Sequence, residues 1–171
     1  MKAKYSSTKL LDKSQDRTLF DCGVEPLNEY LKRYALQNQK KDAARTYVTT
    51  TGENRIVGYY TLVFGSVNQE EATAKVSAGL GKYAIPVILL ARLAIDVGEK
   101  GKGLGKALMR DALIRAVRAS EIAGLRAVLV HAKDETAKNF YQKLGFESAP
   151  HNEFHLFMKM SDIRASLANE E

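Results

Sequence analysis

The stretch EKGKGLGKAL, residues 99–108 of this 171-residue chain, holds three glycines and three lysines, and a helical pattern follows it directly. Glycine lets a turn adopt positive φ and lets another group approach the backbone closely. Backbone N–H groups at the start of a helix, with lysine beside them, are typical of a turn that binds an anion. The stretch therefore predicts a loop that can hold phosphate.

The spacing of the glycines excludes two common phosphate loops. A P-loop requires G-x-x-x-x-G-K followed by Ser or Thr, whereas Gly101 and Gly105 are one residue too close and Ala107 follows Lys106. The dinucleotide fingerprint G-x-G-x-x-G fails as well, because the glycines run G-x-G-x-G. Taken alone, the stretch is also compatible with a plain strand-to-helix turn.

The segments around this loop alternate between strand and helix patterns. Apolar, β-branched runs predict buried strands, and apolar residues at helical spacing predict helices. The expected strands are residues 46–50, 55–67, 84–97, 126–132 and 154–160, and the expected helices are residues 24–41, about 104–123 and 134–144. Residues 68–81 are expected to form a loop and residues 161–171 a frayed tail. This order predicts one α/β or α+β domain over residues 1–171.

Composition limits the class of protein. The net charge of +6 and the pI near 9.3 suit nucleic acid, an anionic cofactor or an acidic partner protein. The longest apolar run, residues 84–91, is too short to span a membrane, and residues 1–10 lack the apolar core of a signal peptide. Cys22 is the only cysteine, and three scattered histidines predict no metal cluster. We therefore expect a cytoplasmic protein without a metal or a membrane partner.

Two motifs, in the right order, resemble those of the GNAT acetyltransferase superfamily. The family pattern Q/R-x-x-G-x-G/A corresponds to residues 100–105, and the pattern N-x-x-A-x-x-F/L-Y-x-x-x-G-F corresponds to residues 134–146. Lys100 replaces the usual Gln or Arg, and Asp134 replaces the common Asn. The resemblance implies the GNAT fold, which is a mixed, mostly antiparallel central sheet that splays between its two central strands and is flanked by helices.

The same resemblance implies acetyl-CoA as the co-substrate. Its pyrophosphate would lie on the loop amides, its pantetheine arm along the preceding strand, and the helix after residue 134 beside it. The residues implied are Leu93, Ala94, Ile95, Lys100, Gly101, Lys102, Gly103, Leu104, Gly105, Lys106, Asn139 and Lys143. For Asn139 and Lys143, an ordinary helix surface explains the residue type equally well.

Tyr141 matches the tyrosine that serves the family as general acid. A phenol, with a pKa of about 10, is protonated at neutral pH and can donate to a departing thiolate. A core aromatic residue beside Phe140 is the alternative interpretation. For the base, the central strand offers only Asp96, and Glu70 and Glu71 lie in an expected loop. An α-amine, with a pKa of about 7.7–8.0, needs less help than a lysine, at about 10.4, so the sequence favours an amine of low pKa.

A closer resemblance covers nearly the whole chain. Residues 20–48, 58–67, 91–113 and 130–146 resemble the acetyltransferase toxins of type II toxin–antitoxin systems. This resemblance implies acetylation of the α-amine of the amino acid on charged tRNA, which blocks translation. It also implies a homodimer and a ribbon-helix-helix antitoxin, whose complex with the toxin would bind operator DNA.

A polyanionic tRNA would be held by lysine and arginine along the rim of the active site. The candidates are Lys32, Arg33, Lys40, Lys41, Arg45 and Arg92, each of which would also suit a solvated helix face. Two other functions stay open: acetylation of a protein N-terminus or a small-molecule amine, and a non-catalytic acetyl-CoA- or RNA-binding module. A basic surface would repel a polycationic substrate, and Tyr141 at the motif position argues against the non-catalytic module.

Overall fold

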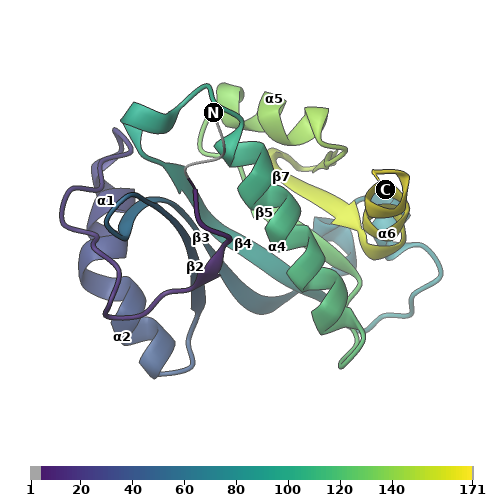
Figure 1. The fold of residues 1–171 in the computed structure, drawn as a ribbon. Coiled ribbons are helices and arrows are strands. Elements are labelled where there is room, and N and C mark those ends of the chain that lie inside the picture. The colour runs from purple at the N-terminus through teal and green to yellow at the C-terminus, as the bar shows by residue number, and fades with distance from the viewer. Residues whose placement is uncertain (1–4, 171) are drawn as a thin grey trace. The chain divides into compact units, whose positions relative to one another are not determined.

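The glycine loop lies between a long strand and a long helix, as its sequence predicts. In the computed structural model, which describes residues 5–170, strand β4 (Ile85–Ile95) leads into a 3-10 turn (Val97–Glu99) and then into the loop. Helix α4 (Leu104–Ser120) begins within the glycine stretch itself (Figure 1). The predicted order of strand, loop and helix is therefore confirmed.

Within residues 5–170, seven strands are hydrogen-bonded in the order β1-β2-β3-β4-β5-β7-β6. The strands besides β4 are β1 (Lys9–Leu10), β2 (Arg45–Thr51), β3 (Arg55–Val67), β5 (Ala127–His131), β6 (Glu147–Ala149) and β7 (Asn152–Lys159). β4 and β5 pair in parallel, whereas β1–β2, β2–β3, β5–β7 and β6–β7 pair antiparallel. The predicted mixed, mostly antiparallel sheet is confirmed. The β4–β5 register ends at Leu90 and Val130, although β4 continues to Ile95.

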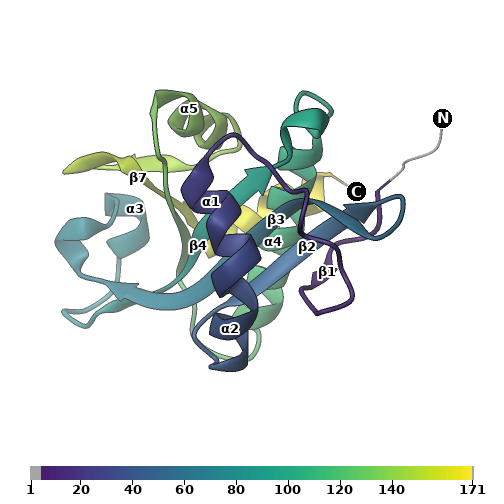
Figure 2. The ribbon, with the colours of Figure 1, turned by 90° about the vertical axis from the view of Figure 1, so that its left-hand side faces the viewer.

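The chain divides into two compact units, and the first comprises the residues up to Val63 together with Ala91–Ala112. Its helical part is α1 (Glu25–Glu29), a π-helical turn (Tyr30–Tyr34) and α2 (Ala35–Lys40), which follow one another across β2 in Figure 2. Proline in the first turn of α1 lacks only an N–H that would have no helical partner there. The predicted helix at 24–41 is thus present, with a π-helical turn in its middle. Its core includes Leu31, Ala35 and Tyr59, all buried.

The second unit comprises Phe64–Leu90 and Leu113–Glu171. Its core includes Val76, Ile85, Leu129 and Phe157. Helix α5 (Glu135–Lys143) begins where predicted, because the Asp134 carboxylate accepts a hydrogen bond from the Ala137 N–H at 2.8 Å. The single domain expected from the sequence stays a prediction.

Two segments differ from the sequence-based expectation. Residues 68–81 are not a plain loop, because they contain a 3-10 turn (Gln69–Glu71) and helix α3 (Ala74–Ser77), whose first turn is capped by the Thr73 hydroxyl. The frayed tail expected at residues 161–171 is wrong as well. Most of it belongs to α6 (Met160–Asn169), which contacts β7 and buries Ile163 completely. The sequence showed no signal for this helix because residues 161–171 are polar on average, and the helix buries only a narrow apolar face. Glu171 lies outside the described residues.

Between residues 5 and 170, no helix has both the length and the apolar character needed to cross a membrane. In the same part of the chain, no three His, Cys, Asp or Glu side chains gather as a metal ion would require.

Candidate active site

The glycine loop adopts the backbone conformation that its composition predicts. Gly101 and Gly103 have φ values of 78° and 83°, in the left-handed region that residues with a side chain rarely adopt. A Cβ atom at either position would meet no protein atom within 4 Å. Glycine is therefore required here by the backbone conformation and not by crowding from the protein. The Leu104 side chain is buried, and α4 starts at this residue, so its first N–H groups belong to the loop.

Two loop lysines are held by neighbouring groups. The Lys100 ammonium donates a hydrogen bond to the Cys22 carbonyl oxygen at 2.9 Å. The Lys102 ammonium forms an ion pair with Glu99 at 2.8 Å. Lys106 is exposed in the first turn of α4. Because an ammonium group has three donor hydrogens, the contact with Cys22 leaves Lys100 able to bind an anion as well.

Asp96, the carboxylate that the sequence offers as a base, is only 3% exposed. Its Oδ1 atom accepts a hydrogen bond from the Gly98 N–H at 2.9 Å. Its Oδ2 atom accepts hydrogen bonds from the Asp21 N–H at 3.1 Å and from the Arg55 guanidinium at 3.2 Å. These donors occupy the lone pairs that a general base would use, so the geometry gives Asp96 a structural part.

The strand residues predicted to lie along pantetheine form the end of β4, directly before the loop. Ala94 is buried in the core of the first unit, and Leu93 and Ile95 are half-buried. The Asp96 N–H that follows them donates to the Val57 carbonyl at 2.8 Å. This bond ties the end of β4 to β3.

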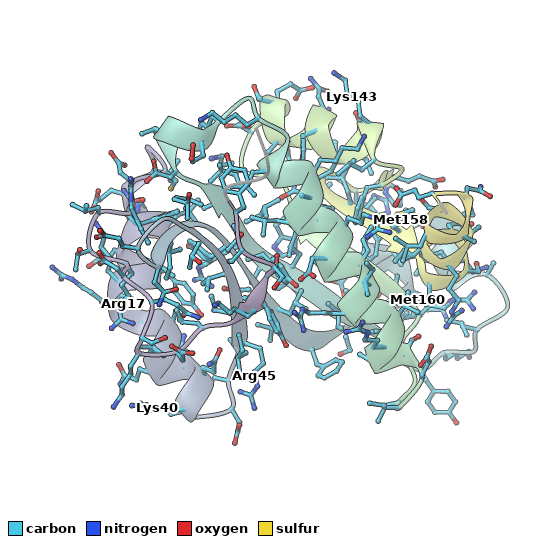
Figure 3. All side chains as sticks on the ribbon, in the orientation of Figure 1. Arg17, Lys40, Arg45, Lys143, Met158 and Met160 are labelled. Atoms are coloured by element: carbon cyan, nitrogen blue, oxygen red, sulfur yellow. The ribbon has the colours of Figure 1, made fainter. Side chains whose placement is uncertain are left out.

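Five of the predicted tRNA-binding residues lie on or beside the helical part of the first unit. Lys32, Arg33, Lys40, Lys41 and Arg45 are all exposed, and Figure 3 shows Lys40 and Arg45 pointing outward. Arg33 pairs with Glu29 at 3.3 Å, and Arg45 pairs with Asp42 at 2.7 Å. Exposed ion pairs are weak, so these contacts do not prevent binding to phosphate.

Arg92 comes from β4, yet its guanidinium lies over a ring of the π-helical turn. The guanidinium carbon is 3.6 Å from the centre of the Tyr30 ring. The Tyr30 ring in turn stacks on Tyr59, with centres 6.5 Å apart and planes inclined by 22°. No sequence signal pointed to Tyr30 as the residue that positions Arg92, because the two are brought together only by the packing of the π-helical turn against the strands.

In the second unit, Tyr141 lies on α5 between two other rings. It is 8% exposed, and its ring meets Phe140 and Phe146 edge-on, at 5.4 Å and 5.8 Å between ring centres. Burial raises the pKa of the Tyr141 phenol to about 12. The hydroxyl is therefore protonated throughout the physiological range, as a proton donor must be. Asn139 and Lys143 are exposed on the same helix, and Figure 3 shows Lys143 at its outer side.

A histidine pair escaped the sequence analysis. His131 and His155 stand opposite each other on β5 and β7, with their rings stacked 4.0 Å apart. Burial, and then the neighbouring His155, lower the pKa of His131. The two histidines become neighbours only through the register of β5 and β7, so no local sequence motif predicts the pair.

The chain belongs to the GNAT acetyltransferases, because the acetyltransferase (GNAT) domain model matches residues 42–148. Among its relatives, a protein of Mycobacterium tuberculosis described as a tRNA-acetylating toxin is 40% identical over 165 residues, which are 96% of this chain and 98% of that protein.

The chain is also similar to solved structures of the proteins AtaT and KacT. AtaT complexed with acetyl-methionyl-tRNAfMet superposes with a TM-score of 0.86 at 30% identity, over 93% of this chain and 97% of that one. A tyrosine-to-phenylalanine mutant of KacT has a TM-score of 0.87 at 28% identity, over 95% of this chain and 99% of that one. Other AtaT structures hold the antitoxin AtaR with acetyl-CoA or with DNA.

Proposed function

We propose that this chain is a toxin that acetylates the α-amine of the amino acid on charged tRNA, using acetyl-CoA, and thereby blocks translation. The observation that carries the proposal is the 40% identity to a tRNA-acetylating toxin along almost the full length of both chains. The solved complex of AtaT with acetyl-methionyl-tRNAfMet supports the same class of substrate.

The glycine loop and its lysines suit the cofactor. Backbone N–H groups, positive-φ glycines and the ammonium groups of Lys100, Lys102 and Lys106 together form a surface that attracts phosphate. We assign the pyrophosphate to Lys100–Lys106, the pantetheine arm to Leu93–Ile95, and further contacts to Asn139 and Lys143. Bound acetyl-CoA supplies a thioester that an amine can attack.

Tyr141 is the proposed general acid. The α-amine forms a bond to the thioester carbonyl carbon and loses a proton to solvent. The carbon–sulfur bond then breaks, and the Tyr141 hydroxyl gives its proton to the departing thiolate and regains one from solvent. Because an α-amine has a pKa of only about 7.7–8.0, this route requires no strong base, in keeping with the part that Asp96 plays.

The proposed partners follow from the same assignment. The basic residues of the first unit, Lys32, Arg33, Lys40, Lys41, Arg45 and Arg92, would hold tRNA phosphates. A cognate antitoxin would neutralise the toxin, and the solved AtaT–AtaR complex with DNA supports DNA binding by such a pair. The homodimer, the ribbon-helix-helix class of the antitoxin and the cytoplasmic location belong to the proposal as well.

Mass spectrometry of charged tRNA tests the proposed function. The purified protein, acetyl-CoA and an unfractionated aminoacyl-tRNA pool should yield aminoacyl-adenosine that carries an added acetyl group on the α-amine. Uncharged tRNA, lysine peptides and polyamines serve as the control substrates. Acetylation of a peptide or a polyamine, with the charged tRNA left unmodified, would overturn the assignment in favour of another GNAT substrate.

A further inference from the structure

A segment far from the glycine loop in the sequence is hydrogen-bonded to it. Residues 21–23, which we call the clasp, lie against the end of β4 and the start of the loop. The Val97 N–H donates to the Asp21 carbonyl at 2.8 Å, and the Lys100 ammonium donates to the Cys22 carbonyl at 2.9 Å. The Lys100–Cys22 contact joins residues that are 78 positions apart along the chain.

Asp96 connects the clasp to the loop. One of its oxygens accepts the Gly98 N–H and so closes the 3-10 turn that begins the loop. The other oxygen accepts the Asp21 N–H of the clasp and the Arg55 guanidinium. Charge-assisted hydrogen bonds to a buried carboxylate are strong, and Asp96 is only 3% exposed. Asp96 therefore determines where the loop leaves the strand.

The clasp is held in one conformation from its other side. The Asp21 carboxylate accepts the Gly23 N–H and the Asn28 side-chain amide, each at 2.9 Å. The Asn28 side-chain oxygen accepts the Cys22 N–H at 2.8 Å. Gly23 has a φ of 85°, which residues with a side chain rarely adopt, so a side chain at this position would strain the backbone. Asn28 lies in α1, so the clasp joins this helix to the loop.

Lys100 can serve the clasp and a ligand together. Its ammonium has three donor hydrogens, and the Cys22 carbonyl takes one. The remaining hydrogens can reach a phosphate while the side chain stays in place. A side chain that is already ordered loses less conformational entropy when the ligand arrives.

We propose that the clasp is part of the acetyl-CoA site, and that Asp96 is the positioning residue through which it presets the phosphate loop. The inference rests on the proposed function, because it takes the loop as the pyrophosphate site. Asp96 touches no reacting atom in this scheme. Its effect is confined to the part of the donor that carries phosphate, which makes the inference testable with two donors.

The test compares acetyl-CoA with S-acetylpantetheine, which has the same thioester and arm but no phosphate. Asp96→Asn has the same shape, but its NH₂ group must face an N–H donor or the guanidinium. We expect about a tenfold loss of kcat/KM with acetyl-CoA, mainly through KM, and little change with acetylpantetheine. The control is Asp12→Asn, which alters an exposed carboxylate that caps a turn at Ser14, outside the clasp. It should leave both donors unchanged.

A second variant covers the case in which Asp96→Asn does not fold. Asn28→Ala frees the clasp without altering the loop, and it should also weaken acetyl-CoA selectively. An equal loss with both donors, or no loss with either, would overturn the role of the clasp. The proposed pyrophosphate site itself fails under a different result, namely a wild-type enzyme that does not prefer acetyl-CoA to acetylpantetheine.

Discussion

The guanidinium of Arg92 lies 3.6 Å from the centre of the Tyr30 ring, so a residue of β4 rests on a residue of the π-helical turn. A cation–π contact of this kind contributes about 0.5–2 kcal/mol, depending on how far the cation is desolvated. It restrains the guanidinium to one orientation. π-helical turns occur often at functional sites, and here the turn brings the ring beneath the cation.

Arg92 and Tyr30 should affect tRNA binding in different ways. Arg92→Gln removes a charge, so it should weaken tRNA binding and reduce the slope of log affinity against log salt concentration by about 0.7–0.9, the effect of one phosphate contact. Tyr30→Leu keeps the charge but removes the ring, so it should weaken binding with an unchanged slope. Filter binding of tRNA at several salt concentrations measures both quantities. An unchanged slope for Arg92→Gln would mean that Arg92 holds no phosphate.

The helical part of the first unit should account for several further phosphate contacts. Replacing Lys32, Arg33, Lys40 and Lys41 together by alanine should flatten the salt dependence by about 0.7–0.9 for each phosphate that these side chains neutralise. Acetyl-CoA affinity should change little. A control variant of equal charge, with Lys9, Lys13, Lys82 and Arg118 replaced, removes exposed cations outside this helical part. If the two variants showed the same slope of log tRNA affinity against log salt concentration, the helical part of the first unit would not be the RNA-binding surface.

Gly103 should be needed for the cofactor as well as for the fold. Gly103→Ala forces a side chain into positive φ, at a cost of about 1–2 kcal/mol, and adds a methyl group where the loop is open. Gly52→Ala is the matched control, because Gly52 also has positive φ and open space but lies between β2 and β3. Both variants should unfold at lower temperature, and calorimetric titration should find weaker acetyl-CoA binding only for Gly103→Ala. If Gly103→Ala bound acetyl-CoA as tightly as wild type, the loop would be a strand-to-helix turn without a role in cofactor binding.

Tyr141→Phe should separate catalysis from binding. The ring and its contacts with Phe140 and Phe146 remain, whereas the proton donor is lost, so the rate should fall by about 10²–10⁴. Acetyl-CoA binding and folding should persist, and the variant should no longer arrest growth when produced without an antitoxin. Full activity would show that another group protonates the thiolate.

The pH dependence of Tyr141 has a definite sign. With a folded-state pKa of about 12 and an ordinary value near 10, the phenol is almost entirely neutral in both states below about pH 9, and its titration changes neither activity nor stability there. Above about pH 9 the unfolded chain ionises first and binds fewer protons, so stability falls until about pH 12. Chemical denaturation of wild type and Tyr141→Phe between pH 8 and 11 should show a steeper decline for wild type. If the free energy of unfolding fell equally with pH in the two proteins, the Tyr141 hydroxyl would not be buried as described.

Helix α6 should contribute to the stability of the fold, which a frayed tail would not do. Ile163→Ala removes a fully buried side chain and should cost about 2–5 kcal/mol, whereas Ser161→Ala changes an exposed residue of the same helix and should cost little. Thermal unfolding of the two variants makes the comparison. Equal midpoints would mean that the tail does not pack.

The local geometry of the candidate site could be predicted from the sequence. The glycine loop, the start of α4 and the Asp134 cap depend on backbone conformation and on hydrogen bonds between residues a few positions apart. Such interactions leave a spacing that the sequence displays. The same holds for the long strands, whose apolar runs reflect burial.

The contacts between distant residues were decided only by the tertiary structure. The bond from Lys100 to Cys22, the burial of Asp96 beneath Asp21 and Arg55, and the stacking of Arg92 on Tyr30 all join separate segments of the chain. The β5–β7 register likewise brings His131 to His155. Each depends on which strands pair, in which register, and where the helices pack on them. These properties result from burial of the whole apolar surface, so no short stretch of sequence carries them.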